Sequence, residues 1–419
     1  MARARNPVRF HTRFDVRSVP KPLTTYLRLY REAFVGLPRV TWVIAFVGLV
    51  NRAGTMVVPF LTLYFKASLG FSAGEAGMLF GTWGVGALVG AYVGGWASDR
   101  FGAVRVQVVT LILCGLGFFW LGQCESWHAL GVALFATGVV FSAFRPANAS
   151  TLASTCPPSK RSQAFALHRL AINLGMAIGP ASGGFLARID YSWLFGVDGS
   201  VCILSGLLLA VLLRGVNVAP VHDEPDTGQD GSPWRDRPFL GLLLVTLASS
   251  FIMFQWFATG SIFFHDVYGM EPDEIGLLLG LNPVLIVAFE MVLVQSLRNR
   301  APLPWIALGV GMLGLSCLML PVGATFAWAI LAVVIWTFGE MFESPLTGAF
   351  VANRAGPEHR GRYMGALNIA FASSAILAPV AGLQVYEVFG PTTMWVCSGC
   401  VGLVAACFAL ILARRVATS

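Results

Sequence analysis

Charged residues are scarce in this chain of 419 amino acids. Asp, Glu, Lys and Arg together make up 12% of it, whereas hydrophobic residues make up 56% and the mean hydropathy is +0.72. Soluble domains carry roughly 25% charged residues, so a water-soluble globular protein is excluded. The 31 Phe and 12 Trp residues also exclude a disordered chain, because so much apolar surface is not left in water.

The signatures of common enzyme sites are missing as well. The sequence has no cluster of His, Asp and Glu at metal-ligand spacing, no Gly-x-Ser-x-Gly segment and no glycine-rich phosphate-binding loop. The eight Cys residues lie mostly in hydrophobic segments and form no disulfide framework. We therefore expect neither an enzyme nor an ATP-driven pump, and no bound metal or cofactor.

Continuous hydrophobic runs rich in Leu, Ala and Gly fill most of the chain. A membrane β-barrel would need short segments in which apolar and polar residues alternate, whereas a membrane-spanning helix needs about 20 apolar residues. The sequence therefore predicts an all-α polytopic membrane protein. Twelve spans are expected at roughly 41–65, 73–97, 104–122, 129–152, 162–187, 194–213, 239–264, 274–296, 305–321, 327–352, 361–387 and 392–413.

The net charge of +7 follows the loops between these spans. Most of the 28 Lys and Arg residues lie in the two tails and the even-numbered loops, and only Lys66 and Arg188 lie in odd-numbered loops. Because positively charged loops remain on the cytoplasmic side, we predict that both termini are cytoplasmic and that the protein crosses the cell (inner) membrane. The excess of positive charge therefore indicates membrane topology and not a nucleic-acid partner.

An internal repeat divides the chain into two halves. Pairs of residues at turns and helix breaks share one offset of 199 positions: Gly70/Gly269, Glu75/Glu274, Gly77/Gly276, Leu79/Leu278, Gly81/Gly280, Pro146/Pro345, Ala153/Ala352, Pro158/Pro357, Arg161/Arg360, Pro180/Pro379 and Gly183/Gly382. We therefore expect two pseudo-symmetric six-helix bundles, related by an axis along the membrane normal.

The predicted domain order follows from this repeat. Residues 1–37 form a basic cytoplasmic segment without a cleavable signal peptide, in which Thr24–Phe34 fits either an interfacial helix or a plain basic tail. The first bundle is expected at 38–214 and the second at 239–413, with a polar cytoplasmic linker at 215–238 and a cytoplasmic tail at 414–419. The linker is too short to form a domain, so function must come from the membrane region.

The loop after the second predicted span contains a recognisable motif. Residues 95–105 read Gly-Trp-Ala-Ser-Asp-Arg-Phe-Gly-Ala-Val-Arg. This segment resembles the signature loop of the major facilitator superfamily, Gly-x-x-x-Asp-Arg-x-Gly-x-(Arg/Lys)-(Arg/Lys), although Val104 occupies one of its basic positions. The resemblance implies a cytoplasmic clamp between the halves, in which Asp99 accepts hydrogen bonds from the eleventh span or a nearby Arg. Its candidate residues are Gly95, Asp99, Arg100, Gly102 and Arg105.

The fifth predicted span contains a second motif. Gly175, Gly179, Pro180, Gly183 and Gly184 match Gly-x-x-x-Gly-Pro-x-x-Gly-Gly, which resembles a motif of the twelve-helix bacterial drug:proton antiporters in that superfamily. The glycine that precedes this motif in the antiporters is replaced by alanine. Gly and Pro at this density bend a helix and allow close approach of its neighbours. Segments 51–54, 144–146 and 339–345 are also similar to that antiporter group.

Six charged residues lie well inside the predicted spans, away from the span ends, where each costs at least about 2.5–3.5 kcal/mol and indicates function. The cations Arg52, Arg145 and Arg169 belong to the first half and the acids Glu290, Glu340 and Glu343 to the second, while Asp198 lies near the outer end of the sixth span. The resemblance implies that spans one, four, seven and ten line a central cavity. The substrate-cavity candidates are Asn51, Arg52, Arg145, Gln255 and Trp256.

Two of the acids are candidates for proton coupling. Glu340 and Glu343 are three residues apart and share a helical face. Two carboxylates this close in a low dielectric do not both ionise easily, so we expect one of them to hold a proton. Glu343 is the favoured carrier and should face Arg145 on the opposite cavity wall. Arg169 and Glu290 are expected to pair as a gate between the halves, in contact only in the outward-open state.

These features predict a secondary active transporter that exports amphipathic or drug-like small molecules in exchange for protons, by alternating access. It would need the lipid bilayer, protons and its small-molecule substrate as partners, would use the proton gradient in place of a cofactor, and would function as a monomer. Two alternatives remain. One is proton-coupled import of a zwitterionic solute such as a peptide or amino acid, and the other is a non-transporting membrane receptor on the same fold.

Overall fold

The computed structural model describes residues 34–216, 232–297 and 299–418. Within these ranges, twelve helical segments are long and apolar enough to cross a membrane. The predicted interfacial segment is described only at Phe34, and residues 217–231 of the predicted linker also lie outside the described part of the chain.

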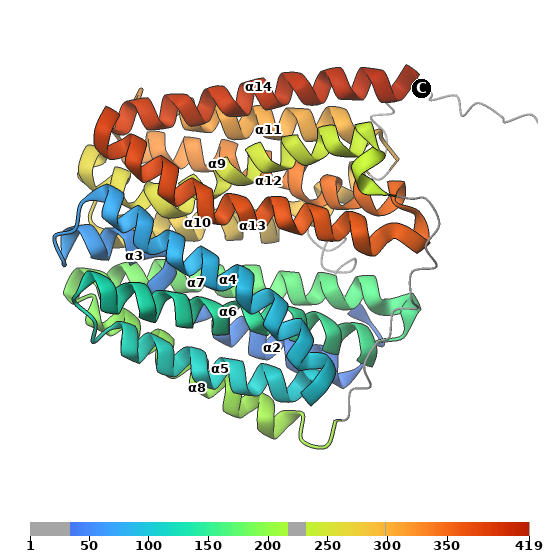
Figure 1. Ribbon diagram of the computed structural model, residues 1–419, viewed down its shortest axis with the longest axis horizontal. Helices are drawn as coiled ribbons and strands as arrows, with labels where there is room; N and C mark the ends of the chain where they lie inside the picture. The colour runs from blue at the N-terminus through green and yellow to red at the C-terminus, as the bar shows by residue number, and fades with distance from the viewer. Residues whose placement is uncertain (1–33, 217–231, 298, 419) are drawn as a thin grey trace, which may run out of the picture.

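The helices form two bundles, one of which lies above the other in Figure 1. The first bundle contains α2 (Arg39–Ala53), α3 (Val57–Ala67), α4 (Ala73–Phe101), α5 (Ala103–Leu121), α6 (Trp127–Thr155), α7 (Arg161–Ile189) and α8 (Ser192–Leu212). The second contains α9 (Arg237–Tyr268), α10 (Pro272–Leu297), α11 (Pro302–Met319), α12 (Phe326–Arg354), α13 (Gly356–Phe389) and α14 (Pro391–Thr418). We call the end at which α2 begins and α14 ends the terminal face, and the other end the opposite face.

Two predicted boundaries differ from the structure. The first span, expected as one helix over 41–65, is broken between Ala53 and Val57 into α2 and α3. The predicted tail at 414–419 continues the last helix as far as Thr418, since the Arg and Ala residues there favour helix. The twelve-span architecture itself is confirmed.

The repeat found in the sequence corresponds to matching backbone positions. Gly70 and Gly269 follow the first and seventh spans and have φ values of +73° and +64°, a region open to glycine. Pro180 and Pro379 lie inside the equivalent helices α7 and α13. The two halves therefore share their turns and breaks because the same residues impose the same local geometry.

The halves cross each other at two matching glycine–proline contacts. A Cβ atom on Gly77 of α4 would collide with the carbonyl oxygen of Pro379 on α13. A Cβ atom on Gly276 of α10 would collide with the carbonyl oxygen of Pro180 on α7. Only glycine permits backbones to approach this closely, so these contacts hold the two bundles together in the half of the molecule nearer the opposite face.

Replacing either glycine with alanine should prevent this closure. We expect Gly77→Ala and Gly276→Ala to slow transport about tenfold, because overpacking costs roughly 1–3 kcal/mol and 1.4 kcal/mol corresponds to a factor of ten. Thr62 is buried, and its hydroxyl bonds the Ala258 carbonyl across the halves. A cysteine placed at this position should react faster with a water-soluble maleimide in the alanine variants.

Gly131→Ala is the matched control for this experiment, because no atom lies within 4 Å of that Cβ position in the described part of the chain. Transport and labelling at the unsubstituted level in Gly77→Ala would show that the close crossing is not needed for closure.

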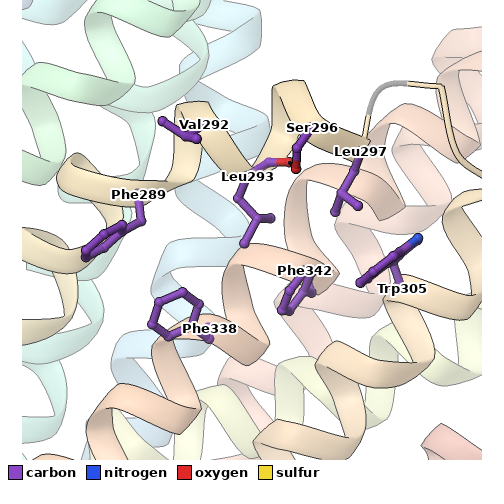
Figure 2. A pocket seen from close by; sticks show the side chains of 8 residues that line it. All are labelled: Phe289, Val292, Leu293, Ser296, Leu297, Trp305, Phe338 and Phe342. Atoms are coloured by element: carbon purple, nitrogen blue, oxygen red, sulfur yellow. Dashed lines mark hydrogen bonds between the residues drawn. The ribbon is translucent and has the colours of Figure 1, made fainter. Parts of the chain in front are cut away.

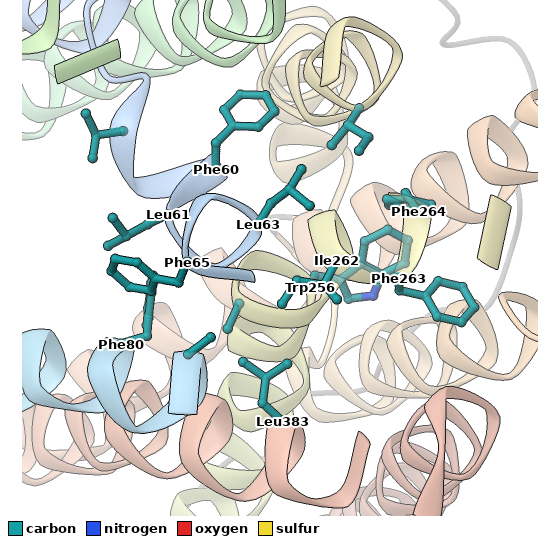
Figure 3. Packing of buried hydrophobic residues seen from close by; sticks show 14 of the residues in the cluster. Phe60, Leu61, Leu63, Phe65, Phe80, Trp256, Ile262, Phe263, Phe264 and Leu383 are labelled. Carbon is teal, nitrogen blue, oxygen red and sulfur yellow. The ribbon is translucent and has the colours of Figure 1, made fainter. Parts of the chain in front are cut away.

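A large buried cluster continues from one half into the other near the opposite face. Phe60 and Leu63 of α3 belong to the same cluster as Ile262 and Phe264 of α9 (Figure 3), and all four are at most 1% exposed. Apolar burial has little driving force against lipid, so tight packing and interhelical hydrogen bonds carry such contacts. The shape match between α3 and α9 therefore contributes to closure on this side.

Polar contacts also join the halves at the opposite face. Lys66 of α3 pairs with Asp266 of α9, which also accepts a hydrogen bond of 2.9 Å from the Tyr386 hydroxyl of α13. Arg188 of α7 pairs with Asp273 of α10 at 2.9 Å. Together with the glycine crossings, these contacts show that the opposite face is closed.

The terminal half of the same crossing is not packed. Among the described residues, no atom lies within 4 Å of the Cβ positions of Gly95 and Gly102 at the terminal end of α4. The same holds for Gly361 and Gly365 at the start of α13. The two helices that cross so closely near the opposite face are therefore separated at the terminal face.

Asp236 attaches the described end of the linker region to the second bundle. Its carboxylate accepts hydrogen bonds from two nitrogens of Arg354 on α12, at 2.6 and 2.7 Å, and one of 3.1 Å from the Tyr363 hydroxyl on α13. Burial works to raise the pKa of Asp236, but the bonds from Arg354 and from the Phe239 N–H outweigh it and hold this pKa below its ordinary value. The carboxylate is thus kept charged at the N-terminus of α9, where it caps the helix.

Candidate functional site

Glu343 of α12 is a buried carboxylate without a cation. Its side chain is enclosed, with the residue 8% exposed. One oxygen accepts hydrogen bonds from the Ser249 hydroxyl of α9 at 3.0 Å and the Thr347 hydroxyl at 3.3 Å. None of the ion pairs found in the described ranges includes Glu343. Two hydroxyls are weak compensation for an ionised carboxylate in a low-dielectric interior.

Glu340 lies one turn earlier on α12 but has different partners. It accepts a hydrogen bond of 3.0 Å from the Asn282 amide of α10, which also donates to the Thr337 hydroxyl at 3.1 Å. Glu343 instead bonds to α9. The two carboxylates therefore occupy separate environments on the two sides of α12, although they remain close enough to interact electrostatically.

Arg169 of α7 and Glu290 of α10 form an ion pair across the two halves. The guanidinium nitrogen lies 2.5 Å from the carboxylate oxygen, and the side chains are 45% and 13% exposed. Counted along each helix at ~1.5 Å per residue, the pair lies about 10–12 Å from the terminal face. The contact predicted from the sequence is thus present.

The predicted dependence of this pair on the outward-open state stays a prediction, because the side of the membrane on which each face lies is itself a prediction. The pair is formed while the opposite face is closed. The helices α7 and α10 also meet nearer the opposite face, at Gly184 against Pro272 and at Gly280 against Ala177. Their contact does not by itself identify a conformational state.

Arg52 and Arg145, two of the cations predicted in the first half, do not pair with the acids of α12. The Arg52 guanidinium of α2 lies 5.0 Å from the ring centre of Phe141, a cation–π contact. Arg145 of α6 is exposed, and no ion pair in the described chain involves it. The structure does not bring Arg145 and Glu343 together across a cavity, because Glu343 points into its own half toward Ser249.

Two predicted cavity residues are part of the packed core. Gln255 is fully buried, donates 2.7 Å to the Ala378 carbonyl of α13 and accepts from Thr259 at 2.8 Å. Trp256 is 1% exposed and stacks on Trp336 at 4.9 Å between ring centres. The assignment of Gln255 and Trp256 to the cavity wall is therefore corrected: they join α9 to α13 and α12. Asn51 is also buried and donates to Cys202 at 3.3 Å.

Asp198 is more deeply integrated than its position in the sequence indicated. Its carboxylate accepts hydrogen bonds from the backbone N–H groups of Met56 at 3.1 Å and Val57 at 3.2 Å, where α3 begins. The residue is 1% exposed. The sequence contains one sign of this contact between Asp198 and the start of α3. The sixth span has a lone acid, and the first span contains Gly54 and Pro59, which favour a break.

Comparison with known proteins decides the family. The profile described as Major Facilitator Superfamily matches residues 42–379. The chain belongs to the major facilitator superfamily. The superfamily and the relatives below are transporters, so the protein is a membrane transporter and not an enzyme.

Superfamily relatives cover most of the chain at low identity. A Na(+), Li(+), K(+)/H(+) antiporter of Planococcus maritimus is 26% identical over 369 residues, which cover 79% of this chain and 85% of that one. The quinolone resistance protein NorA of Staphylococcus aureus is 22% identical over 346 residues, covering 80% and 86%. A crystal structure of a peptide transporter POT in complex with sulfate aligns with a TM-score of 0.78 at 18% identity, covering 91% and 96%, which shows the shared fold.

The superfamily signature loop is not engaged as a clamp in this structure. The Asp99 side chain is exposed and has no bonding partner among the residues described here, because the start of α13 is separated from the end of α4. Arg100 lies over the rings of Trp96 and Phe101, at 6.0 Å each, and Arg105 is exposed. Gly102, with φ +88°, forms the turn between α4 and α5. The predicted Asp99 contact to the eleventh span is therefore absent in this conformation.

Neutralising Asp99 should affect transport and leave the observed conformation unchanged. Because Asp99 is exposed and has no bonding partner among the described residues, Asp99→Asn is expected to preserve the thermal stability of the purified protein within about 0.5 kcal/mol, the usual range for surface changes. If the clamp forms when the terminal face closes, the same variant should lower the transport rate. Stability and flux are measured on one preparation, with the exposed Glu125→Gln as control. Unchanged flux would remove the clamp role.

The glycine motif of the fifth span has two contact surfaces. Gly175, Gly179 and Gly183 pack against the backbone of α2 and the break after it, within the first half. Gly184 packs against Pro272 and Asp273 of α10, in the second half. The motif thus meets the second half at Pro180 and Gly184, and its first three glycines accommodate the first span.

An apolar groove of about 310 Å³ lies between α10, α11 and α12 (Figure 2). Its lining is aromatic and aliphatic, with the Trp305 and Phe342 rings stacked at 5.5 Å. None of the carboxylates described above lines it. In the described ranges there is also no group of three or more His, Cys, Asp or Glu placed to hold a metal ion.

Proposed function

We propose that this transporter is a proton-coupled antiporter of the cell (inner) membrane that exports amphipathic or drug-like small molecules. The observation that carries the proposal is Glu343, which is enclosed and has only hydroxyl partners. Burying a carboxyl group in this environment costs little free energy when the group is protonated and much more when it is ionised. A bound cationic substrate or a conformational change can therefore displace its proton, which is the exchange that an antiporter needs.

The arrangement of charge supports an amphipathic substrate. No ion pair in the described ranges includes either acid of α12, although Arg169 acts electrostatically on Glu340. The Arg52 and Arg145 guanidinium groups lie in the other half. Positively charged drug-like molecules would be attracted to Glu340 and Glu343 at mid-membrane depth. The relatives named as a cation/proton antiporter and a quinolone resistance protein support the same assignment.

The observed conformation fits the first step of such a cycle. With both termini in the cytoplasm, as the positive charges of the loops predict, the closed opposite face is the outer one and the separated ends of α4 and α13 are cytoplasmic. An exporter takes up its substrate from this inward-facing state. We further propose that a single chain completes the cycle as a monomer.

Transport in proteoliposomes tests this function. Inside-out vesicles with an imposed pH gradient should accumulate ethidium, a lipophilic cation, and collapse of the gradient should stop the accumulation. Empty vesicles are the control. Gradient-driven uptake of a zwitterionic dipeptide in right-side-out vesicles, without ethidium flux, would instead establish the importer, which the exposed Arg145 would suit as a carboxylate partner. Saturable ligand binding without any flux would establish a receptor.

A further inference from the structure

The break in the first span is held by a carboxylate from another helix. Met56 and Val57 donate their N–H groups to the same Oδ2 atom of Asp198 on α8, at 3.1 and 3.2 Å. The first N–H groups of a helix have no partner within that helix, and the positive end of its dipole favours an anion there. Asp198 therefore caps α3 at a buried position, 1% exposed, where water cannot replace it.

The second half shows what happens without this acid. The 199-residue shift places Gln255 and Trp256 at the positions of Met56 and Val57, and both lie inside the unbroken helix α9. The same shift places Cys397 at the position of Asp198. Break and carboxylate thus occur together in one half and are absent together from the other, which indicates that Asp198 maintains the break.

The carboxylate has one cation and a small void beside it. The charged and titratable groups around it in the described structure are Arg52 of α2, Cys202 of α8 at 3.7 Å from Oδ1, and Cys114 of α5 next to Cys202. A void of about 10 Å³ is lined by Arg52, Cys114 and Cys202 together with Asn51. This is about the space for one water molecule, and Cys202, which lines it, contacts the carboxylate of Asp198.

The break also rests on the glycine motif of α7. Gly179 lies against the carbonyl oxygens of Arg52 and Thr55, and Gly183 lies against Met56. The helix that supports the break carries Arg169, which pairs with Glu290 in the other half. A movement of the break is therefore transmitted through packed backbone to the contact between the halves.

We propose that Asp198 is a second proton-binding site of the transporter, located in the first half, and that protonation loosens the start of α3. A proton from water forms an O–H bond with a carboxylate oxygen. The two N–H bonds to that group then change from charge-assisted to neutral, which makes each roughly half as strong. Arg52 loses its neutralising partner and becomes available to an anionic group or to water. This deepens the proposed proton coupling and adds a site to Glu343.

Hydrogen–deuterium exchange tests the site without any substrate. In the purified full chain, exchange of the segment around residues 51–60, corrected for intrinsic pH dependence, should be faster at mildly acidic than at mildly alkaline pH. Asp198→Asn and Asp198→Ala should exchange about two- to thirtyfold faster than the unsubstituted chain at alkaline pH, the usual effect of losing an N-cap. Neither variant should retain the pH dependence.

Two variants serve as controls. Asp190→Asn removes an exposed carboxylate in the turn before the same helix α8, where it accepts a 2.8 Å bond from the Ser192 N–H, and should leave the segment unchanged. Glu343→Gln should also leave it unchanged, which separates failure of this proposal from failure of the proton-coupling role of Glu343. Equal exchange in Asp198→Asn and the unsubstituted chain, or pH dependence that persists in Asp198→Asn, would overturn the proposal.

Discussion

Glu343→Gln is expected to abolish transport driven by a pH gradient while substrate exchange continues. Glutamine keeps the shape of the side chain and can still accept from Ser249 and Thr347, so the packing at α9 is preserved. It cannot gain or lose a proton, so net movement coupled to protons should fall by more than about tenfold, equivalent to 1.4 kcal/mol or more. The measurement is gradient-driven ethidium uptake beside exchange of preloaded ethidium in the same vesicles.

Two controls determine what a loss at Glu343 means. Ser249→Ala removes a hydrogen-bond donor but keeps the titratable group, so gradient-driven transport should remain measurable. Glu340→Gln tests the neighbouring acid, which bonds to Asn282 on the other side of α12. Gradient-driven uptake that survives in both Glu343→Gln and Glu340→Gln would show that neither residue couples the proton.

Reversing one charge of the Arg169–Glu290 pair is expected to lower the transport rate strongly, and exchanging both charges is expected to restore part of it. Arg169→Glu places a second acid opposite Glu290 in place of an attractive pair, and should reduce transport by more than about tenfold. Arg169→Glu with Glu290→Arg restores the attraction in reverse and should recover part of the rate. Because the Arg169 side chain is 45% exposed, solvent screens the pair and full rescue is not expected.

The same two helices provide the matched control. Arg188 and Asp273 also join α7 to α10, but at the opposite face, where the Arg188 side chain is 60% exposed. Reversal of this exposed pair should change transport little. If the double exchange at 169 and 290 recovers nothing, and the two side chains lie apart in a structure open on the opposite face, the pair has no role between the halves.

The parts of the fold predicted correctly from the sequence are those set by local chemistry. Continuous apolar runs located the spans, and Gly70, Gly269, Pro180 and Pro379 imposed the same turns and breaks in both halves. The break of the first span was missed because it depends on Asp198, which lies 142 residues away from Met56 in the chain. Hydropathy along one helix contains no sign of such a partner.

The candidate site was predicted only in part for a related reason. In a membrane protein, apolar residues cover both the lipid face and the core, so the pattern around Trp256 could not distinguish a cavity wall from the stack with Trp336. Charged residues are different, because each one in a span needs a partner. That rule led to Arg169 and Glu290, whose contact is present. It could not identify Ser249 as the partner of Glu343, because hydroxyl residues are common in the spans.

The two glycine–proline crossings have the arrangement of an isologous interface, in which residue i meets j and j meets i. Gly77 meets Pro379 as Gly276 meets Pro180, and each member of one pair is 199 residues from its counterpart in the other. A six-span chain with one such glycine and one such proline would be complementary to a second copy of itself. Two identical halves could form the same contacts as a symmetric dimer. Because a covalent linker joins the halves in one chain, each half can carry different charged residues.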